Sequence, residues 1–223
     1  MAAQHRSTAE GRVAFAKLCE KYWFPLYAFV RQSEHDVHRA RDLTQSFFAK
    51  LMEKNYVGDA DPKRGRFRTF LLASLSNFMA NEWNREQAQK RGGGVQHLSL
   101  DFEKGDRWLG QEPGDSESPE RLFERRWALS LLRQTLDRLR EQFASSERYE
   151  LFMELRQYLV PGETEAYADV ASRAGMAEGA LRVAVHRLRA QYREILREEI
   201  ADTLSSTSDV DDEIGRLFEV FSS

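Results

Sequence analysis

The sequence contains too little cysteine, and too few long apolar runs, for several classes of protein. Cys19 is the only cysteine among 223 residues, which excludes an internal disulfide and a cysteine-rich metal site. The N-terminus lacks the apolar core of a signal peptide, and no apolar run is long enough to cross a bilayer. We therefore expect a soluble cytoplasmic protein without membrane insertion.

Motifs that carry catalytic chemistry are also missing. The sequence has no glycine-rich phosphate cradle and no metalloprotease motif. It also has no cluster of histidines, cysteines or paired carboxylates that would form an active site. We therefore expect that the chain is not an enzyme and that it needs no metal and no cofactor.

Charge is abundant, but neither sign dominates. Charged residues make up 31% of the chain, and the formal net charge is −3. Any binding of nucleic acid must therefore come from local basic patches and not from a globally basic surface. Hydrophobic residues, at 41%, are numerous enough to form packed cores.

Helical periodicity runs through most of the chain, and no segment has the pattern of a strand. Glycine, proline and acidic stretches interrupt this pattern and mark the domain boundaries. We predict an all-α fold of two small helical domains joined by an acidic linker and followed by a short helical tail. The predicted ranges are 1–91 for the first domain, 92–119 for the linker, 120–203 for the second domain and 204–223 for the tail.

Two short helical patterns meet at Gly175 in the stretch "YADVASRAGMAEGALRVAVHRLR", residues 167–189. A glycine at this place can take the left-handed conformation that ends one helix before the next begins. On a helical wheel of the second pattern, one side gathers the apolar residues Ala180, Leu181, Ala184, Val185 and Leu188. The opposite side carries Glu178, Gly179, Arg182, Val183 and His186.

This pattern has two interpretations. Arginine can pair with guanine in a bidentate manner, and glutamate can accept a hydrogen bond from cytosine. The second helix therefore fits a recognition helix in the major groove of DNA. The alternative is an ordinary helical hairpin with a solvated basic face.

A second polar set surrounds the helix predicted from about Arg68 to Gln89. It combines basic residues, amide donors and an aromatic side chain, which is the combination that holds single-stranded DNA with its bases unstacked. The alternative is a solvated face with Trp83 in the core, and a core position is favoured for Trp83. The predicted contacts are Lys63, Arg64, Arg66, Asn77, Asn81 and Arg85.

The preceding helical segment carries a smaller patch. Asp42, Gln45 and Phe48 lie together, while Leu43 and Phe47 point toward the expected core. An exposed phenylalanine beside an acid and an amide predicts a surface that docks on another protein.

Three motifs, in this order, resemble the extracytoplasmic-function group of bacterial RNA polymerase sigma factors over nearly the whole chain. The motif "RDLTQSFFAKLM" is similar to the region-two helix that docks on the clamp helices of core polymerase. The motif "RGRFRTFLLASLSNFMANEWNREQAQKR" is similar to the segment that melts and captures the −10 element. The motif "YADVASRAGMAEGALRVAVHRLRAQYREIL" is similar to the region-four helix-turn-helix that binds the −35 element.

The resemblance implies a promoter-specificity subunit whose partners are promoter DNA and the clamp helices and flap of core polymerase. It assigns the polymerase contact to Asp42, Gln45 and Phe48. It assigns the −10 contacts to the set from Lys63 to Arg85 named above. It assigns the −35 element to Arg173, Glu178, Gly179, Arg182, His186 and Arg187, with Arg173 and Arg187 near phosphates.

Other functions fit parts of the sequence. A stand-alone helix-turn-helix regulator would bind a DNA duplex without polymerase, but it leaves the docking patch unexplained. A helical adaptor that binds only proteins would not depend on Arg182. Members of the sigma family are often held by an anti-sigma protein, so an anti-sigma factor or another regulator is a further candidate partner.

Overall fold

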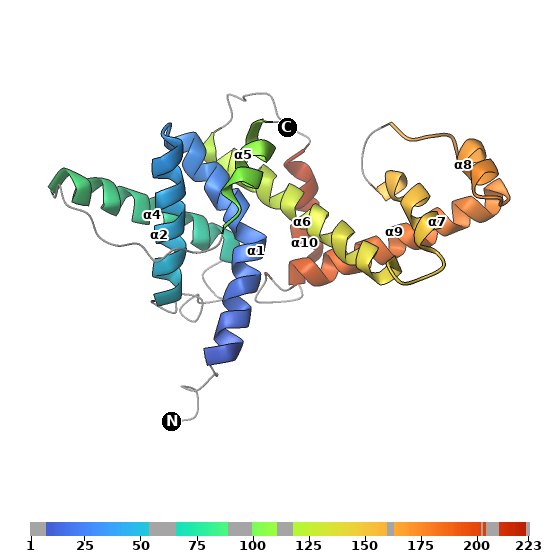
Figure 1. Cartoon of the computed structure of the whole chain (residues 1–223), viewed down its shortest axis with the longest axis horizontal. Coiled ribbons are helices and arrows are strands. Elements are labelled where there is room, and N and C mark those ends of the chain that lie inside the picture. Colours follow the sequence, from blue (N-terminus) through green and yellow to red (C-terminus); the bar gives the residue numbers. More distant parts are fainter. Residues whose placement is uncertain are drawn as a thin grey trace. The chain divides into compact units, whose positions relative to one another are not determined.

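A computed structural model describes the chain over residues 8–53, 66–88, 100–110, 118–159, 163–201, 203 and 210–221. Every element in these ranges is a helix (Figure 1), which agrees with the predicted all-α class. None of the described helices has the length and apolar character required to cross a membrane. The predicted DNA contacts Lys63 and Arg64 lie outside the described residues.

The chain divides into two compact units. The first comprises Met1–Ser130, Thr203–Ser205 and Gly215–Ser223, and the second comprises Leu131–Asp202 and Ser206–Ile214. The division falls inside helix α6 (Pro119–Phe143), and helix α10 (Val210–Glu219) is likewise shared between the units. The boundary therefore differs from the predicted linker over 92–119.

Helix α5 (Phe102–Gly110) explains this difference, because it packs against α1 (Thr8–Ser33) within the first unit. The buried Phe102 ring lies 5.0 Å from the ring of Tyr27. The Asp106 carboxylate accepts hydrogen bonds from the Tyr27 hydroxyl and the Arg41 guanidinium, both at 2.6 Å. Burial alone would raise the pKa of Asp106, but these two bonds hold it below its ordinary value. Residues 102–110 are thus a folded part of the first unit.

Helices α1 and α2 (Val37–Glu53) are separated by a short break at residues 34–36. The Asp36 carboxylate accepts hydrogen bonds from the backbone amides of His38 and Arg39 at 2.8 and 3.2 Å. These bonds satisfy amides that have no partner inside the helix, so Asp36 is the N-terminal cap of α2. The same two bonds lower the pKa of Asp36.

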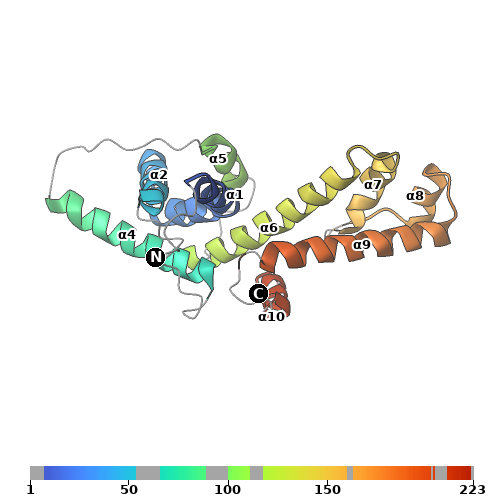
Figure 2. The ribbon, with the colours of Figure 1, turned by 90° about the horizontal axis from the view of Figure 1, so that it is seen from below.

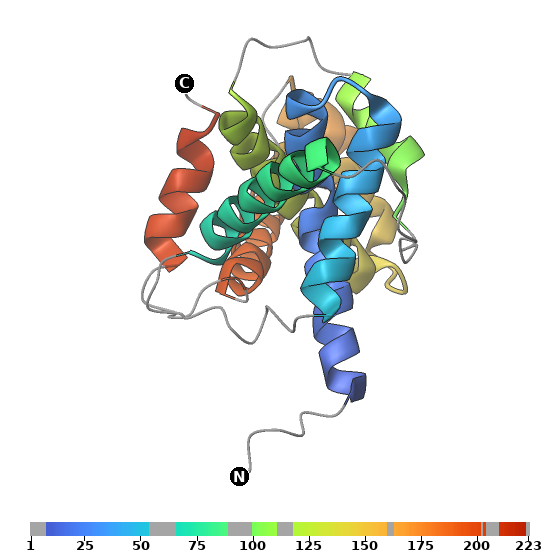
Figure 3. The same ribbon diagram turned by 90° about the vertical axis from the view of Figure 1, so that its left-hand side faces the viewer.

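Helix α2 packs against both α1 and α4 (Phe67–Ala88). Figure 2 looks along α1 and α2 with α4 running below them, and Figure 3 shows α2 and α4 side by side. The centre of the Phe47 ring lies 5.6 Å from that of Phe78 on α4, and the centre of the Phe48 ring lies 6.4 Å from that of Phe15 on α1. Because α2 packs against α1 on one side and α4 on the next, two adjacent faces of α2 are apolar.

This packing overturns the prediction that Phe48 is exposed. The Phe48 side chain is completely buried. Its place in the motif is explained by contact with α1 and not by docking on another protein. Of the predicted docking residues, Asp42 is exposed and Gln45 is half-buried, so these two remain at the surface.

Helix α4 is also held against α6 by a buried basic residue. The Arg68 Nε donates to Glu124 at 2.8 Å, and its guanidinium carbon lies 4.2 Å from the centre of the Trp127 ring. Burial lowers the pKa of Arg68, because removing the guanidinium from water disfavours its charge. Arg68 thus orients the start of α4 from inside the first unit.

The second unit is built from the end of α6, α7 (Tyr149–Leu155), the short helix η2 (Arg156–Leu159), α8 (Tyr167–Arg173) and α9 (Glu178–Ala201). One apolar core joins these helices. The Tyr192 hydroxyl also donates to the backbone carbonyl of Leu132 at 3.1 Å, which ties α9 to α6. The buried core residues are Leu139, Phe152, Leu155, Tyr158, Val170, Ala171, Leu181, Val185, Leu188, Tyr192 and Ile195.

The burial of Phe48 predicts a large loss of stability on truncation. Phe48→Ala should lower the free energy of unfolding of the first unit by about 3–5 kcal/mol, because it removes a fully buried ring. The matched control Met52→Ala, at an exposed position of the same helix, should change it by less than about 0.5 kcal/mol. All four tryptophans lie in the first unit, so urea unfolding followed by tryptophan fluorescence measures that unit. Equal losses for the two variants would contradict the packing.

Candidate nucleic-acid interface

The turn between α8 and α9 has the geometry that the sequence predicts. Gly175 has a φ of 65°, in the left-handed region that favours glycine. The Met176 amide donates to the carbonyl of Ala171 at 3.0 Å, and the Gly175 amide donates to that of Ser172 at 3.2 Å. This pair of bonds is a Schellman motif, which satisfies the last carbonyls of α8 and ends it sharply.

Helix α9 turns one face into the core and the other toward solvent. Leu181, Val185 and Leu188 are buried with Val170 and Ala171 of α8. The burial pattern confirms the two predicted faces except at Ala180, which the sequence predicts on the buried side and which is exposed. The predicted contacts on α9 are all exposed, and they are Glu178, Gly179, Arg182, His186 and Arg187.

Arg182 is exposed but held in place. Its Nε and Nη2 atoms donate to one carboxylate oxygen of Glu178 at 3.0 and 2.5 Å. Its guanidinium carbon lies 4.5 Å from the centre of the Tyr167 ring. Sequence reasoning missed Tyr167, because a cation over an aromatic ring from another helix leaves no periodic signal.

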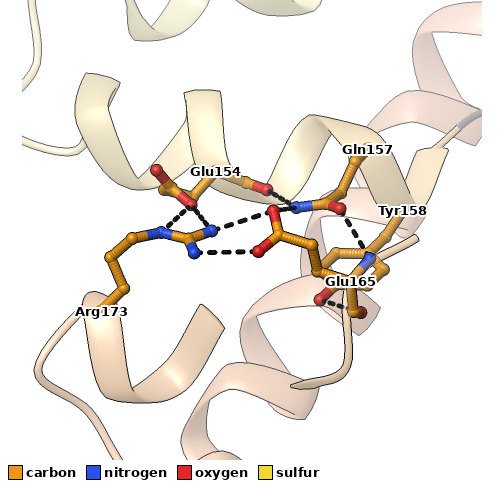
Figure 4. Close-up of polar contacts among 5 residues, drawn as sticks. All are labelled: Glu154, Gln157, Tyr158, Glu165 and Arg173. Atoms are coloured by element: carbon orange, nitrogen blue, oxygen red, sulfur yellow. Dashed lines mark hydrogen bonds and ion pairs between the residues drawn. The ribbon is translucent and has the colours of Figure 1, made fainter. Parts of the chain in front are cut away.

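Arg173, a predicted phosphate contact, pairs with two carboxylates (Figure 4). Its Nε and Nη2 donate to Glu154 at 3.0 and 2.6 Å, and its Nη1 and Nη2 donate to Glu165 at 2.9 and 3.0 Å. These four bonds engage four of the five N–H donors of a guanidinium. They raise the pKa of Arg173 and lower that of Glu165.

The phosphate contact of Arg173 stays a prediction, because its side chain is 48% exposed in spite of these bonds. Its guanidinium joins α8 to α7 and to the segment before α8. Gln157 adds to the same network, because its side-chain oxygen accepts a hydrogen bond from the Glu165 amide at 3.0 Å (Figure 4). The network fixes the position of α8, on which the orientation of α9 depends.

In the first unit, Asn77 and Asn81 are exposed on α4 and line a pocket of about 240 Å³. The pocket lies between α2 and α4, and the Lys50 ammonium within it lies 5.0 Å from the centre of the Phe78 ring. Amides, a cation and an aromatic wall are thus brought together in one hollow. The other lining residues are Phe47, Leu51 and Ser74.

The end of α4 exposes an aromatic side chain. Trp83 is 55% exposed, which overturns the core position that the sequence favours for it. Asn84 and Arg85 beside it are also exposed, and Arg85 pairs with Glu82 at 3.6 Å. The buried stripe of α4 includes Leu71, Leu75 and Phe78, so Trp83 follows its last fully buried position by more than one turn. Arg66, just before α4, is half-buried.

The Arg173 network predicts a local effect on dynamics. Arg173→Gln should make the amide of Glu165 exchange its hydrogen several-fold faster, because both carboxylates lose their partner. The control Arg187→Gln changes an exposed arginine of α9 and should leave that exchange rate unchanged. Hydrogen exchange followed by mass spectrometry of the 163–173 segment measures both. Equal rates in the two variants would show that the network is not needed to hold the segment.

The two units thus present different candidate surfaces. The second unit exposes one charged helix face with an arginine fixed by a carboxylate and an aromatic ring. The first exposes amides beside a pocket and, farther along α4, a tryptophan. Comparison of the chain with protein-family models, with curated proteins and with solved structures found no match in any of the three.

Proposed function

We propose that this chain is a promoter-specificity subunit of bacterial RNA polymerase, of the extracytoplasmic-function sigma type. It binds core polymerase, recognises the −35 element as a duplex and captures one strand of the opened −10 element. The observation that carries the proposal is the helix pair α8–α9, joined at Gly175, whose second helix exposes the predicted contacts. The three sequence motifs, in family order, support it.

Helix α9 has the features required for entry into a major groove. A Cβ atom added at Gly179 would meet nothing within 4 Å apart from the adjoining residues and backbone of its own helix, so this part of the helix surface is open for close approach to DNA. Arg182 and Glu178 carry the groups that pair with guanine and cytosine. Arg187 lies on a different part of the exposed surface, where a basic residue contacts phosphate and sets the position of the helix.

Helix α4 has the features required for holding an unpaired strand. Asn77 and Asn81 offer amide donors and acceptors at the mouth of the pocket, and Lys50 adds a positive charge. Trp83 presents an open ring for stacking, a contact that tolerates any base because every base has a flat π surface. A duplex would hide its bases from these groups, so the surface suits DNA that has already opened.

Asp42 and Gln45 on α2 supply the surface for core polymerase in this proposal. Both are accessible, whereas Phe48 supports them from beneath by packing on α1. A stand-alone helix-turn-helix regulator remains the alternative function, since the second unit alone carries the duplex-binding features. It would leave the amide and tryptophan surface of α4 without a role.

The deciding experiment combines a pull-down with transcription. The purified chain is mixed with bacterial core polymerase, and the complex is supplied with a library of promoter sequences. We expect binding to core and transcripts from a subset of promoters that share two elements. Binding of duplex DNA without binding of core would favour the stand-alone regulator and contradict the proposal.

The exposed ring of Trp83 predicts that its loss weakens binding to single-stranded DNA and not to duplex DNA. Trp83→Ala should weaken the hold on the single-stranded −10 element by about 1–3 kcal/mol, because one stacked base loses its partner. Trp83→Phe keeps an aromatic ring and should retain most of the effect. Fluorescence anisotropy with a single-stranded −10 oligonucleotide bound to the polymerase complex measures the affinity. Wild-type affinity in Trp83→Ala, or an equal loss for duplex DNA, would exclude the stacking role.

A further inference from the structure

The guanidinium of Arg182 lies between two groups that come from different elements. Glu178, one turn earlier on α9, holds its Nε and Nη2 atoms. Tyr167, the first residue of α8, has its ring beneath the guanidinium carbon, with 4.5 Å between that carbon and the ring centre. The side chain of Arg182 is nevertheless 60% exposed, so this arrangement leaves it accessible to a ligand.

The Tyr167 ring is itself firmly supported. It stacks on the ring of Tyr158 with 4.6 Å between centres and 4° between planes. Tyr158 is buried, its hydroxyl donates to the carbonyl of Glu165 at 3.0 Å, and its own carbonyl accepts from Arg189 Nε at 3.1 Å. The two stacked rings therefore form a platform that is anchored to both η2 and α9.

The contacts of Arg182 occupy the N–H donors on one edge of its guanidinium group and leave another edge for a ligand. Glu178 engages the side edge of the guanidinium, which consists of Nε–H and one Nη2–H. The end edge, with one N–H on Nη1 and one on Nη2, is not used by Glu178. Two parallel donors at such an edge match the O6 and N7 acceptors of guanine.

Resting on the proposed function, we propose that Tyr167 is a positioning residue for base recognition. Its ring fixes the plane of the Arg182 guanidinium, so that the end edge is already oriented when the helix enters the groove. An arginine side chain otherwise loses much rotational freedom on binding, and fixing it beforehand reduces that cost. Tyr167 would in this way determine specificity at one base pair without contacting the base.

The first test concerns the platform itself and needs no DNA. A proton near the face of an aromatic ring resonates upfield, so the side-chain protons of Arg182 should be shifted upfield in NMR spectra of the full chain. Tyr167→Phe keeps the ring and should preserve the shift, whereas Tyr167→Leu should abolish it. An Arg182 without an upfield shift in the wild-type chain would overturn the proposal whatever the protein's function.

The second test measures base discrimination. The full chain, bound to core polymerase, selects sequences from a duplex library randomised over the upstream promoter element. Tyr167→Leu should reduce the preference for the selected base by about two- to fivefold, because the free energy of a cation–π contact at an exposed site corresponds to a change of this size. The reduction should occur at one base pair, the same one at which Arg182→Ala reduces the preference. Tyr167→Phe should select the wild-type motif. Tyr167→Met provides a second ring-free variant if Tyr167→Leu unfolds on heating before the wild type.

The salt dependence separates positioning from the other roles of Tyr167. Loss of a phosphate contact would weaken all sequences equally and reduce the slope of affinity against salt. General damage to the fold would also lower affinity for all sequences. Either result, or an unchanged motif in both ring-free variants, overturns the positioning role while leaving the proposed function intact. A wild-type chain that selects no motif overturns both.

Discussion

The left-handed backbone at Gly175 is the constraint on which the second unit depends. An L-residue with a side chain is strained in that conformation, so the direction in which the chain leaves α8 is set by a glycine. The Schellman bonds end α8 within one residue, and α9 then crosses back over Val170 and Ala171. Because small side chains meet at this crossing, Leu181 and Val185 become buried. The exposed face of α9 is the consequence, and every proposed duplex contact lies on it.

Charged side chains serve two purposes in this protein, and their partners distinguish them. Arg68 pairs with Glu124, and Arg173 pairs with Glu154 and Glu165. These carboxylates lie outside the arginine's own helix, and each arginine holds one helix against another. Arg182 and Arg85 pair with a glutamate on their own helix and remain open to solvent. A pairing within one helix contributes little to the fold, since exposed pairs of this kind are worth only a few tenths of a kcal/mol. Both arginines therefore remain accessible to a ligand, and the helices do not depend on their pairs.

In the proposed function, the two units offer complementary chemistry for one nucleic-acid partner. The surface of α9 combines charge with an open helix face, which suits base edges in a duplex. The surface of α4 combines amides, a lysine and a tryptophan, which suits bases that have left the stack. With a net charge of −3, the chain has no general attraction for DNA. Recognition in the proposed function thus relies on these local groups and on delivery by polymerase.

The amino-acid sequence by itself determined most of the helices, the turn at Gly175 and the two faces of α9, because these follow from local backbone preference and from a period of 3.6 residues. Tertiary structure alone decided which neighbour covers each face. Phe48 is buried because α1 lies against it, Trp83 is exposed because the buried stripe of α4 stops short of it, and Arg173 is engaged because Glu154 and Glu165 come from other segments. Residues 102–110 form a helix of the first unit because Phe102 and Asp106 find partners on α1 and α2. Contacts between different segments leave no periodic pattern in the sequence, so the sequence does not predict them. The contact between Arg182 and Tyr167 is one such contact.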